Sequence, residues 1–479
     1  MTTKLKKIDF FGNGIYSKSP VVTRQRRLNC YYEFREDADK TNAVLYGTPG
    51  LKLKFNLTSP NNNSLRGIMG SPLGLFAVVG NTFYYLTASG SVIHSHTMTT
   101  FNGTVSMSFN ATQVIVVDGI AGWLYTVASD TWSQITSNFP NGAQTVAFLN
   151  SFFIVEDSGT GEFFVSNSGD GSTWNALAFA TAAQYPDTLV AVDAFMGLLV
   201  LYGTTHMEFW QNVGASPEPF QYIQNSANEY GLAARFSRAH VGNSQLFLTN
   251  TQEGGYQVAM TTGYQTQIVS TPDIDNIIQG LAVVSDAVAV SYQIDNHNFY
   301  QLTFPHDSRS LLYDVTTGLW GETQSGITTN YAQRHLGQYS TVYNGANYVT
   351  DYSNGNVYVY DINTYTDNSM TIPREVTTRH AQNDFNRFRV SQVYLDMETG
   401  SGLQTGQGSN PQVMMQVSKD NGRTWGNERW APLGIVGQYN QRVNWRRVAH
   451  ARDVVCRFRM TDPVKFTVTG GAAIISARQ

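Results

Sequence analysis

Seven short runs of aromatic and β-branched residues recur along the chain, with 40 to 55 residues from the start of one run to the start of the next. They start at Phe83, Trp123, Phe163, Met207, Tyr256, Leu311 and Val357. Each follows a glycine-bearing turn or a polar loop. Repeats of about 40 to 50 residues that are built from short strands are typical of β-propellers, with about four strands in each blade. The repeat therefore predicts a propeller.

A second series of apolar segments lies between these runs, at 74–80, 112–119, 151–157, 197–203, 244–250 and 287–293. They are expected to be inner strands covered on both faces, which need not alternate. Together the two series predict six or seven blades over roughly residues 60–370, with no convincing helix. An irregular stack of β-sandwiches is the alternative, but radial closure leaves fewer exposed sheet edges.

The pattern changes after residue 373. Segments such as 388–398 and 454–462 alternate cleanly between apolar and polar residues, which predicts an antiparallel β-domain, a sandwich or a barrel, with one solvated face. We therefore expect an all-β chain with three parts. Residues 1–59 form a basic arm and one or more strands that close the propeller, 60–373 form the propeller, and 374–479 form an arginine-rich β-domain.

Composition agrees with this fold class and limits the chemistry. Only 14% of the residues are charged and 42 are glycine, which suits many strands joined by tight turns. The two cysteines, Cys30 and Cys456, are too few for a disulfide framework or a zinc site and are expected to be reduced, buried thiols. The sequence has no apolar run of about 20 residues, so no membrane span is predicted.

Charge is distributed unevenly along the chain. Residues 1–30 contain seven Lys or Arg against one acid, and residues 67–234 contain eleven acids and no Lys or Arg. Residues 374–479 contain thirteen Arg and two Lys against eight acids. The sequence thus has a basic head, an acidic middle and an arginine-rich tail.

The stretch SKDNGRTW, at 418–425, fits the Asp-box turn found in sialidases and other propeller glycosidases. Sialidases hold the carboxylate of their substrate with arginines from several blades, and the arginine-free span argues against that chemistry. We predict no catalytic residues and no enzyme. Ser418 and Asp420 should instead cap a hairpin, with Gly422 at positive φ and Trp425 packed beneath the turn.

Metal and cofactor sites are also not predicted. His94 and His96 share one strand face, but the sequence shows no third ligand near them. The acidic stretch DIDN at 273–276 contains possible calcium ligands, although a polar turn is the simpler interpretation.

Three segments resemble one family. They are 205–250, with Glu208-Phe209-Trp210, Pro219-Phe220, Gly231-Leu232-Ala233-Ala234 and Leu246-Phe247-Leu248; 26–53, with a Gly-Thr-Pro-Gly turn; and 442–474, with a closing strand of the type RVxWRRV. In this order they are similar to the packaged-DNA stabilisation proteins of short-tailed bacteriophages, which are tail nozzle or hub components.

The resemblance implies a structural protein of the virion tail, assembled in the host cytoplasm. Such a subunit forms a ring, expected to be a hexamer, below the portal and adaptor rings. The ring encloses double-stranded DNA without reading its sequence and helps to retain it until ejection. Further partners would be a tail needle or plug, fibre or spike proteins, and the host envelope. A propeller that binds a host-surface glycan, or a glycosidase, remains the alternative.

The charge pattern suits a DNA conduit. Lys and Arg would bind phosphates, whereas an acidic or neutral wall leaves DNA mobile. We expect some acids of the middle span to line or face the channel: Asp118, Asp130, Glu156, Asp157, Asp170, Asp187 and Asp193.

The basic residues of the two ends are candidates for contacts with other subunits or DNA, or for a solvated face; these are Lys4, Lys6, Lys7, Arg24, Arg26, Arg27, Arg442, Arg446, Arg447, Arg452, Arg457 and Arg459. Alternation places Arg457 and Arg459 on one strand face, with Cys456 and Phe458 on the other. The basic head is expected to be unstructured when free and to dock onto the adaptor.

Overall fold

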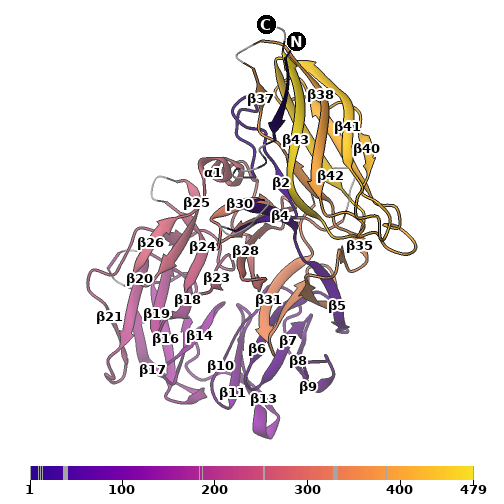
Figure 1. Cartoon of the computed structure of the whole chain (residues 1–479). Coiled ribbons are helices and arrows are strands. Elements are labelled where there is room, and N and C mark those ends of the chain that lie inside the picture. Colours follow the sequence, from indigo (N-terminus) through magenta and orange to yellow (C-terminus); the bar gives the residue numbers. More distant parts are fainter. Residues whose placement is uncertain are drawn as a thin grey trace.

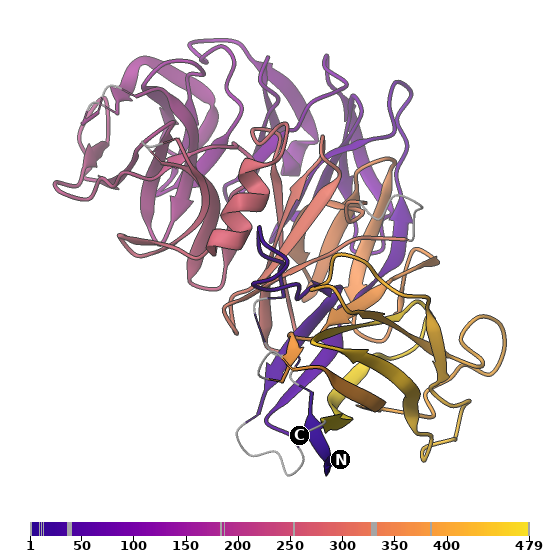
Figure 2. The same ribbon diagram turned by 90° about the horizontal axis from the view of Figure 1, so that it is seen from above.

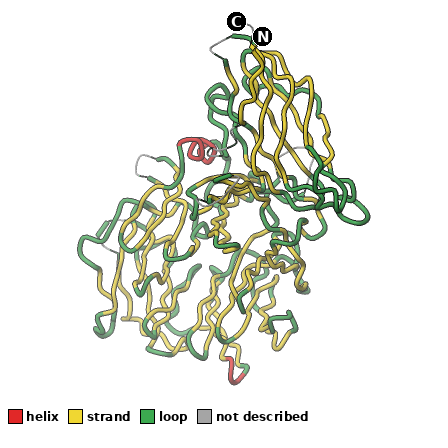
Figure 3. The backbone as a smooth tube through the Cα atoms, in the orientation of Figure 1, coloured by secondary structure: helices red, strands yellow, loops and turns green. Residues whose placement is uncertain are grey.

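Seven antiparallel sheets form a ring in the computed structural model, and a β-sandwich stands on one side of this ring (Figure 1). The structure describes residues 2–8, 10, 12, 14–35, 41–182, 184–185, 187–251, 254–326, 333–383 and 386–477. Strands make up nearly all of the regular structure (Figure 3), as the sequence predicts for an all-β chain.

The first four blades follow the chain in order, and each has four strands. Blade one contains β6 (Leu65–Ser71), β7 (Gly74–Val79), β8 (Thr82–Leu86) and β9 (Val92–Thr97). Blade two contains β10 (Ser106–Phe109), β11 (Gln113–Val117), β12 (Gly122–Thr126) and β13 (Thr131–Ile135). Blade three contains β14 (Val146–Leu149), β15 (Phe152–Glu156), β16 (Glu162–Asn167) and β17 (Asp170–Thr181). Blade four contains β18 (Leu189–Phe195), β19 (Leu198–Gly203), β20 (Met207–Asn212) and β21 (Phe220–Tyr222).

The last three blades depart from this regular pattern. Blade five contains β22 (Gly231–Leu232), β23 (Ala239–Val241), β24 (Ser244–Asn250), β25 (Tyr256–Thr262) and β26 (Gln265–Ile268). Blade six contains β27 (Val288–Ile294), β28 (His297–Phe304), β29 (Arg309–Asp314) and β30 (Leu319–Glu322). Blade seven contains β31 (Gly337–Tyr343), β32 (Ala346–Asp351) and β33 (Asn356–Asp361), and the N-terminal strand β5 (Gly50–Asn56) is its fourth strand. The pair β34 (Thr366–Asp367) and β35 (Met370–Thr371) extends that sheet.

The aromatic repeat corresponds to one position in the blade. All seven runs are the third strand in the sheet order of their blade. The first five apolar segments are second strands, whereas 287–293 falls on β27, the first strand of blade six. Of the two blade numbers that the sequence left open, the described residues form seven.

The sandwich is built from both ends of the chain. One sheet has the order β3 (Cys30–Phe34), β4 (Ala43–Gly47), β43 (Thr467–Ala477), β38 (Phe388–Met397) and β41 (Val443–Ala451). The other contains β36 (Arg374–Thr377), β42 (Asp453–Met460), β39 (Gln412–Ser418) and β40 (Arg429–Pro432), with β37 (Ala381–Gln382) beside β42. Their inner faces enclose a core around Trp445, Phe458 and Val413.

The N-terminal residues are ordered, contrary to expectation. Strand β1 (Thr2–Lys7) pairs antiparallel with β43, from Thr2 opposite Ala477 to Lys7 opposite Ala472. Both ends of the chain consequently lie side by side at the tip of the sandwich (Figures 1 and 2). The reason is that β43 has an open edge whose backbone groups β1 satisfies.

The two domains share one continuous sheet. Strand β2 (Arg27–Leu28) pairs parallel with β30 of blade six, through Leu28 and Glu322, and antiparallel with β36 of the sandwich. The chain therefore connects propeller and sandwich by main-chain hydrogen bonds as well as by side chains. This geometry fixes the direction in which the sandwich leaves the propeller.

One α-helix is present in the described residues, where the sequence predicts none. Helix α1 (Pro272–Gln279) begins with proline at its first turn and buries Ile274, Ile277 and Ile278. The DIDN stretch therefore forms the first turn of this helix and not a polar loop, and its acids favour the positive end of the helix dipole. None of the helices in the described part of the chain is long and apolar enough to span a membrane.

Candidate interdomain arginine site

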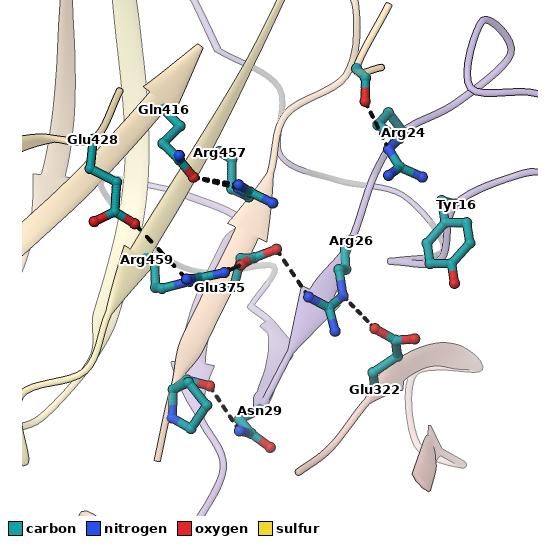
Figure 4. A network of polar contacts seen from close by, with 12 residues as sticks. Tyr16, Arg24, Arg26, Asn29, Glu322, Glu375, Gln416, Glu428, Arg457 and Arg459 are labelled. Atoms are coloured by element: carbon teal, nitrogen blue, oxygen red, sulfur yellow. Dashed lines mark hydrogen bonds and ion pairs between the residues drawn. The ribbon is translucent and has the colours of Figure 1, made fainter. Parts of the chain in front are cut away.

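A chain of ion pairs joins the propeller to the sandwich across the N-terminal segment (Figure 4). Glu375 on β36 is completely buried and accepts two bonds from Arg459 on β42, at 3.0 and 2.6 Å. Its other oxygen lies 3.4 Å from Arg26 Nη1. Arg26 also donates to Glu322 at the end of blade six. Two carboxylates and two guanidiniums from three parts of the chain thus form one network.

The network continues along the wall of a cavity of about 720 Å³ between the domains. Arg309 of β29 donates to Glu322 and, at 3.0 Å, to the Tyr16 hydroxyl. Arg24 lies over the same Tyr16 ring, 5.1 Å from its centroid. The Arg309 guanidinium lies 5.8 Å from the same centroid, so one aromatic ring contacts two cations, which its π-face attracts.

Both buried carboxyls of the network are held ionised. Burial opposes ionisation of Glu322, but Arg26 and Arg309 outweigh it and lower its pKa. For Glu375 burial also opposes ionisation, while Arg26, Arg459 and Arg457 together lower the pKa. Because the charged forms are favoured in the folded chain, the network stabilises the domain junction at neutral pH.

This predicts an acid-sensitive junction. The ordinary pKa of a glutamate is about 4.3. A glutamate whose pKa is lower in the folded chain stabilises the fold fully above about pH 4.3, and this stabilisation is lost as the pH falls through the lowered pKa. Thermal unfolding from pH 5 to pH 3 should show this loss. Glu322→Gln should flatten the pH dependence relative to the unmodified chain, and equal slopes for both would contradict the assignment.

The Asp-box turn forms as the sequence predicts and touches this site. Ser418 Oγ accepts the Gly422 amide at 2.8 Å, and Asp420 accepts the amide and hydroxyl of Thr424 at 2.9 and 2.6 Å. Gly422 has φ +79°, and a Cβ there would lie 2.3 Å from Arg24 Cγ. Arg24 Nε donates to the Gly422 carbonyl at 3.2 Å. The turn therefore docks the sandwich onto the N-terminal segment.

Trp425 is placed differently from the expectation of a ring packed beneath the turn. It is half-buried, and its ring lies over the guanidinium of Arg457 at 4.3 Å from the centroid. Both side chains line the interdomain cavity.

Trp425→Ala should therefore lower the free energy of unfolding by about 1–2 kcal/mol, less than the 3–5 kcal/mol of a fully buried ring. Chemical denaturation of the purified chain measures this. Trp430→Ala, which removes a ring that is 59% exposed, is the control and should change little. A loss above about 3 kcal/mol for Trp425→Ala would contradict the half-buried geometry.

Asn29, which no sequence motif marks, is the central polar contact of the junction. It is 1% exposed and adopts φ +52°. Its amide nitrogen donates to the carbonyls of Gln324 and Pro373 at 2.9 and 2.8 Å. Its oxygen accepts the Thr323 hydroxyl and the Gln324 amide, both at 2.9 Å. One side chain thus joins the end of blade six to the start of the sandwich.

The predicted basic residues fall into two groups. Arg24, Arg26, Arg27, Arg457 and Arg459 lie in or beside the junction and serve contacts within the chain, a use that the sequence did not suggest. Strand β42 alternates as predicted, with Phe458 and Cys456 in the sandwich core. The second group is exposed on the sandwich: Lys4, Lys6, Lys7, Arg442, Arg446, Arg447 and Arg452.

The predicted acidic residues are dispersed over blades two to four, and most hold local structure. Glu156 is fully buried and accepts bonds from Gln144 and Thr145. Asp118, Asp170 and Asp187 accept hydrogen bonds in turns, from residues 120–121, 172–173 and 204–206. Asp157 is half-buried and Asp130 is exposed.

Two of these acids bind histidine or arginine across blades. Burial opposes ionisation of Asp193, but His240 and Arg238, both at 3.1 Å, lower its pKa to about 2. Asp130 contacts His94 at 2.9 Å and His96 at 2.8 Å. The two histidines of blade one are therefore paired with an acid of blade two. Within the described ranges no group of three or more His, Cys, Asp or Glu side chains is arranged to hold a metal ion.

Comparison with solved structures finds matches at low identity and low TM-score. The N-terminal domain of Nup159 is 11% identical, with 68% of this chain and 97% of that chain covered and a TM-score of 0.39. The Pan2 WD40 domain of Neurospora crassa is 8% identical, with coverages of 66% and 95% and a TM-score of 0.41. No curated protein matches the chain.

Two family models match in sequence, and the boundary between them agrees with the boundary between blade seven and the C-terminal strands of the sandwich. The model described as bacteriophage P22 Gp10, beta-propeller, matches residues 31–365, and the one described as bacteriophage P22 Gp10, beta-sandwich, matches residues 373–476. The matched ranges meet where the seventh blade ends and the sandwich begins. The chain therefore belongs to the bacteriophage P22 Gp10 family, the tail nozzle or DNA-stabilisation proteins of podophages, and is a phage structural protein.

Proposed function

We propose that this protein is the subunit of a ring, a hexamer, that lies below the portal and adaptor rings of the virion tail. The ring extends the DNA channel and helps to retain the packaged genome until ejection. The observation that carries the proposal is the match of both domains to one phage family, over 31–365 and 373–476. Partners are the adaptor above, a needle or plug, fibre or spike proteins, and the host envelope during infection.

The domain junction supports a mechanical role. A retaining ring bears the outward pressure of DNA, so its two domains should not rotate relative to one another. The shared sheet through β2 and the buried carboxylate of Glu375 resist such rotation. A surface ion pair would not, since it contributes little.

The arrangement of charge supports weak contact with DNA. No Lys or Arg occurs between residues 66 and 235, so blades two to four and most of blade one present no cation to phosphates. Of the seven acids predicted to face the channel, Asp130 alone is exposed, and we propose it as the best candidate for a channel wall. Such a wall repels the DNA backbone and lets it slide.

Electron microscopy of the purified chain, combined with size analysis, tests the ring. We expect a six-fold ring with a central hole wide enough for duplex DNA. A monomer that binds oligosaccharide would instead favour the glycan-binding alternative and would refute the proposal.

The exposed lysines of β1 provide a test of docking. Lys4, Lys6 and Lys7 are exposed at the tip of the sandwich, and we propose that they face acidic groups of the adaptor. Changing all three to Glu should reduce incorporation into tails by about tenfold or more, because like charges at an interface are strongly unfavourable. Thermal unfolding of the free chain should change little. The control is the double variant Arg446→Glu, Arg447→Glu, which reverses exposed charges elsewhere on the sandwich and should leave incorporation unchanged. Normal incorporation of the lysine variant would refute this docking site.

A further inference from the structure

A second cavity, of about 440 Å³, lies where the β3–β4 hairpin meets the β27–β28 turn of blade six, the loop after β33 of blade seven and the residues just before β43. Its walls are aromatic, with Tyr31, Tyr46, Tyr365 and Phe466. Exposed residues, among them Asn296 and Asn363, surround its mouth. The cavity therefore opens to solvent at one end and reaches the junction of the two domains at the other.

Arg374 lies at the inner end of this cavity and has no polar partner among the described residues. It is 1% exposed, and Nε, Nη1 and Nη2 all lack a hydrogen-bond partner. Burying a cation in this way costs several kcal/mol. Arg66, also 2% exposed, shows how the fold treats a structural guanidinium, because it donates to the carbonyls of Gly103, Gly80 and Thr100.

Packing holds the Arg374 guanidinium in place. A Cβ at Gly47 would lie 2.2 Å from Arg374 Nε, although Gly47 does not have the positive φ that requires glycine. Its lack of a side chain leaves room for the guanidinium. The Tyr365 ring lies on another side, with its centroid 5.8 Å from Arg374 Cζ. The space around the Arg374 guanidinium therefore fits a cation, but no hydrogen-bond acceptor of the described residues contacts it.

The other charged groups around the cavity are already engaged or lie at its mouth. Arg35 pairs with Glu33 at 2.5 Å, and Lys465 pairs with Glu398 at 2.8 Å. The remaining acid of the wall, Asp295, is exposed.

The buried Asp367 does not supply the missing acceptor. Its two oxygens accept the Leu51 amide and the Ser325 hydroxyl, at 3.2 and 2.6 Å. Burial raises the pKa of Asp367 to about 7, so this carboxyl is only partly ionised near neutral pH. Arg374 therefore remains a buried cation without a bound carboxylate.

We propose that this cavity binds a small oxyanion, which Arg374 contacts through the fork of its guanidinium. Carboxylates and phosphates both match the planar donors of arginine. The three nitrogens are covered in the free chain, so binding requires a wall side chain to move, and we propose that this is the half-buried Tyr365, whose ring centroid lies 5.8 Å from Arg374 Cζ. The oxyanion is a free phosphate-type ion or a carboxylate side chain of a second copy; the second source rests on the proposed ring.

Thermal unfolding of the full chain in sodium phosphate, at constant ionic strength set with sodium chloride, tests the site. If a free ion binds, the Tm should rise with the logarithm of the phosphate concentration, by about 3 °C at roughly 100 times the dissociation constant. Arg374→Met should abolish this rise, because Met fills the space without a donor. Arg389→Met, at an exposed arginine of β38, is the matched control and should keep the rise.

The second source is tested by sedimentation of the same variants. If a carboxylate of another copy fills the cavity, phosphate should weaken self-association, and Arg374→Met should weaken it by about tenfold or more relative to Arg389→Met. If Arg374→Met does not fold, Gly47→Ala replaces it, since its Cβ displaces the guanidinium. A phosphate response that is absent or equal in all variants, together with unchanged self-association, would overturn the proposal without affecting the proposed ring.

Discussion

Glu375→Ala should lower the free energy of unfolding by about 3 kcal/mol, because it leaves two guanidiniums without their shared carboxylate. Arg26 and Arg459 keep only 21% and 14% side-chain exposure, so water cannot fully replace Glu375. The expected loss lies at the lower end of the range for broken buried ion pairs, because both arginine side chains remain partly exposed to water. Urea unfolding followed by tryptophan fluorescence measures the loss.

The same variant should also separate the unfolding of the two domains. Glu375 is a residue of the sandwich, and through Arg26 it is connected to Glu322 of blade six. When this link is removed, the sandwich and the propeller should no longer unfold in one transition.

Glu428→Ala is the matched control for Glu375→Ala. Glu428 contacts the same Arg459 at 3.9 Å, but its side chain is 34% exposed, so its removal should cost less than about 1 kcal/mol. Equal losses for the two variants would show that the network contributes no more than a surface ion pair.

Asn29→Leu should lower the free energy of unfolding by about 3–4 kcal/mol. Leucine has nearly the same shape but leaves Thr323, Gln324 and Pro373 with buried polar groups that have lost their partner. It also places a branched side chain at φ +52°, where asparagine is tolerated. Chemical denaturation measures the sum of both effects.

Two further variants separate the loss of the Asn29 hydrogen bonds from the backbone strain. Asn29→Gly keeps the backbone conformation and loses only the amide, so it should be less destabilising than Asn29→Leu. Asn344→Ala, at an exposed turn residue with φ +47°, should cost about 1 kcal/mol from backbone strain alone. If Asn29→Leu cost no more than Asn344→Ala, the hydrogen bonds of Asn29 would not stabilise the junction.

Much of the architecture could be predicted from the sequence because blades repeat locally. Every blade repeats the same strand order, so a run of aromatic or β-branched residues recurs at each third strand, beginning with Phe83 and Trp123. The Asp-box could be predicted for the same reason, since Ser418, Asp420 and Gly422 satisfy one another within five residues. In both cases the determining contacts are close in the chain.

The sequence predictions for helix α1 and the sixth apolar segment are wrong because these patterns are ambiguous over short lengths. Eight residues with Ile274, Ile277 and Ile278 buried give too few turns for helical periodicity to show. Strand β27 is as apolar as a second strand, and only its pairing shows that it is the first strand of its blade.

The all-β class, the propeller repeat, a second β-domain after residue 373 and the alternation of Arg457 and Arg459 against Phe458 can all be predicted from the residues alone. The closure of blade seven by β5 depends on the fold, as do the contacts of Arg26 with Glu322 and Glu375, which lie 296 and 349 positions away. The burial of Asn29 and Arg374 at the domain junction depends on the fold as well. The physical reason is the range of the contacts: a strand or turn is specified by neighbours in the chain, whereas a buried charge is specified by whatever the fold brings beside it.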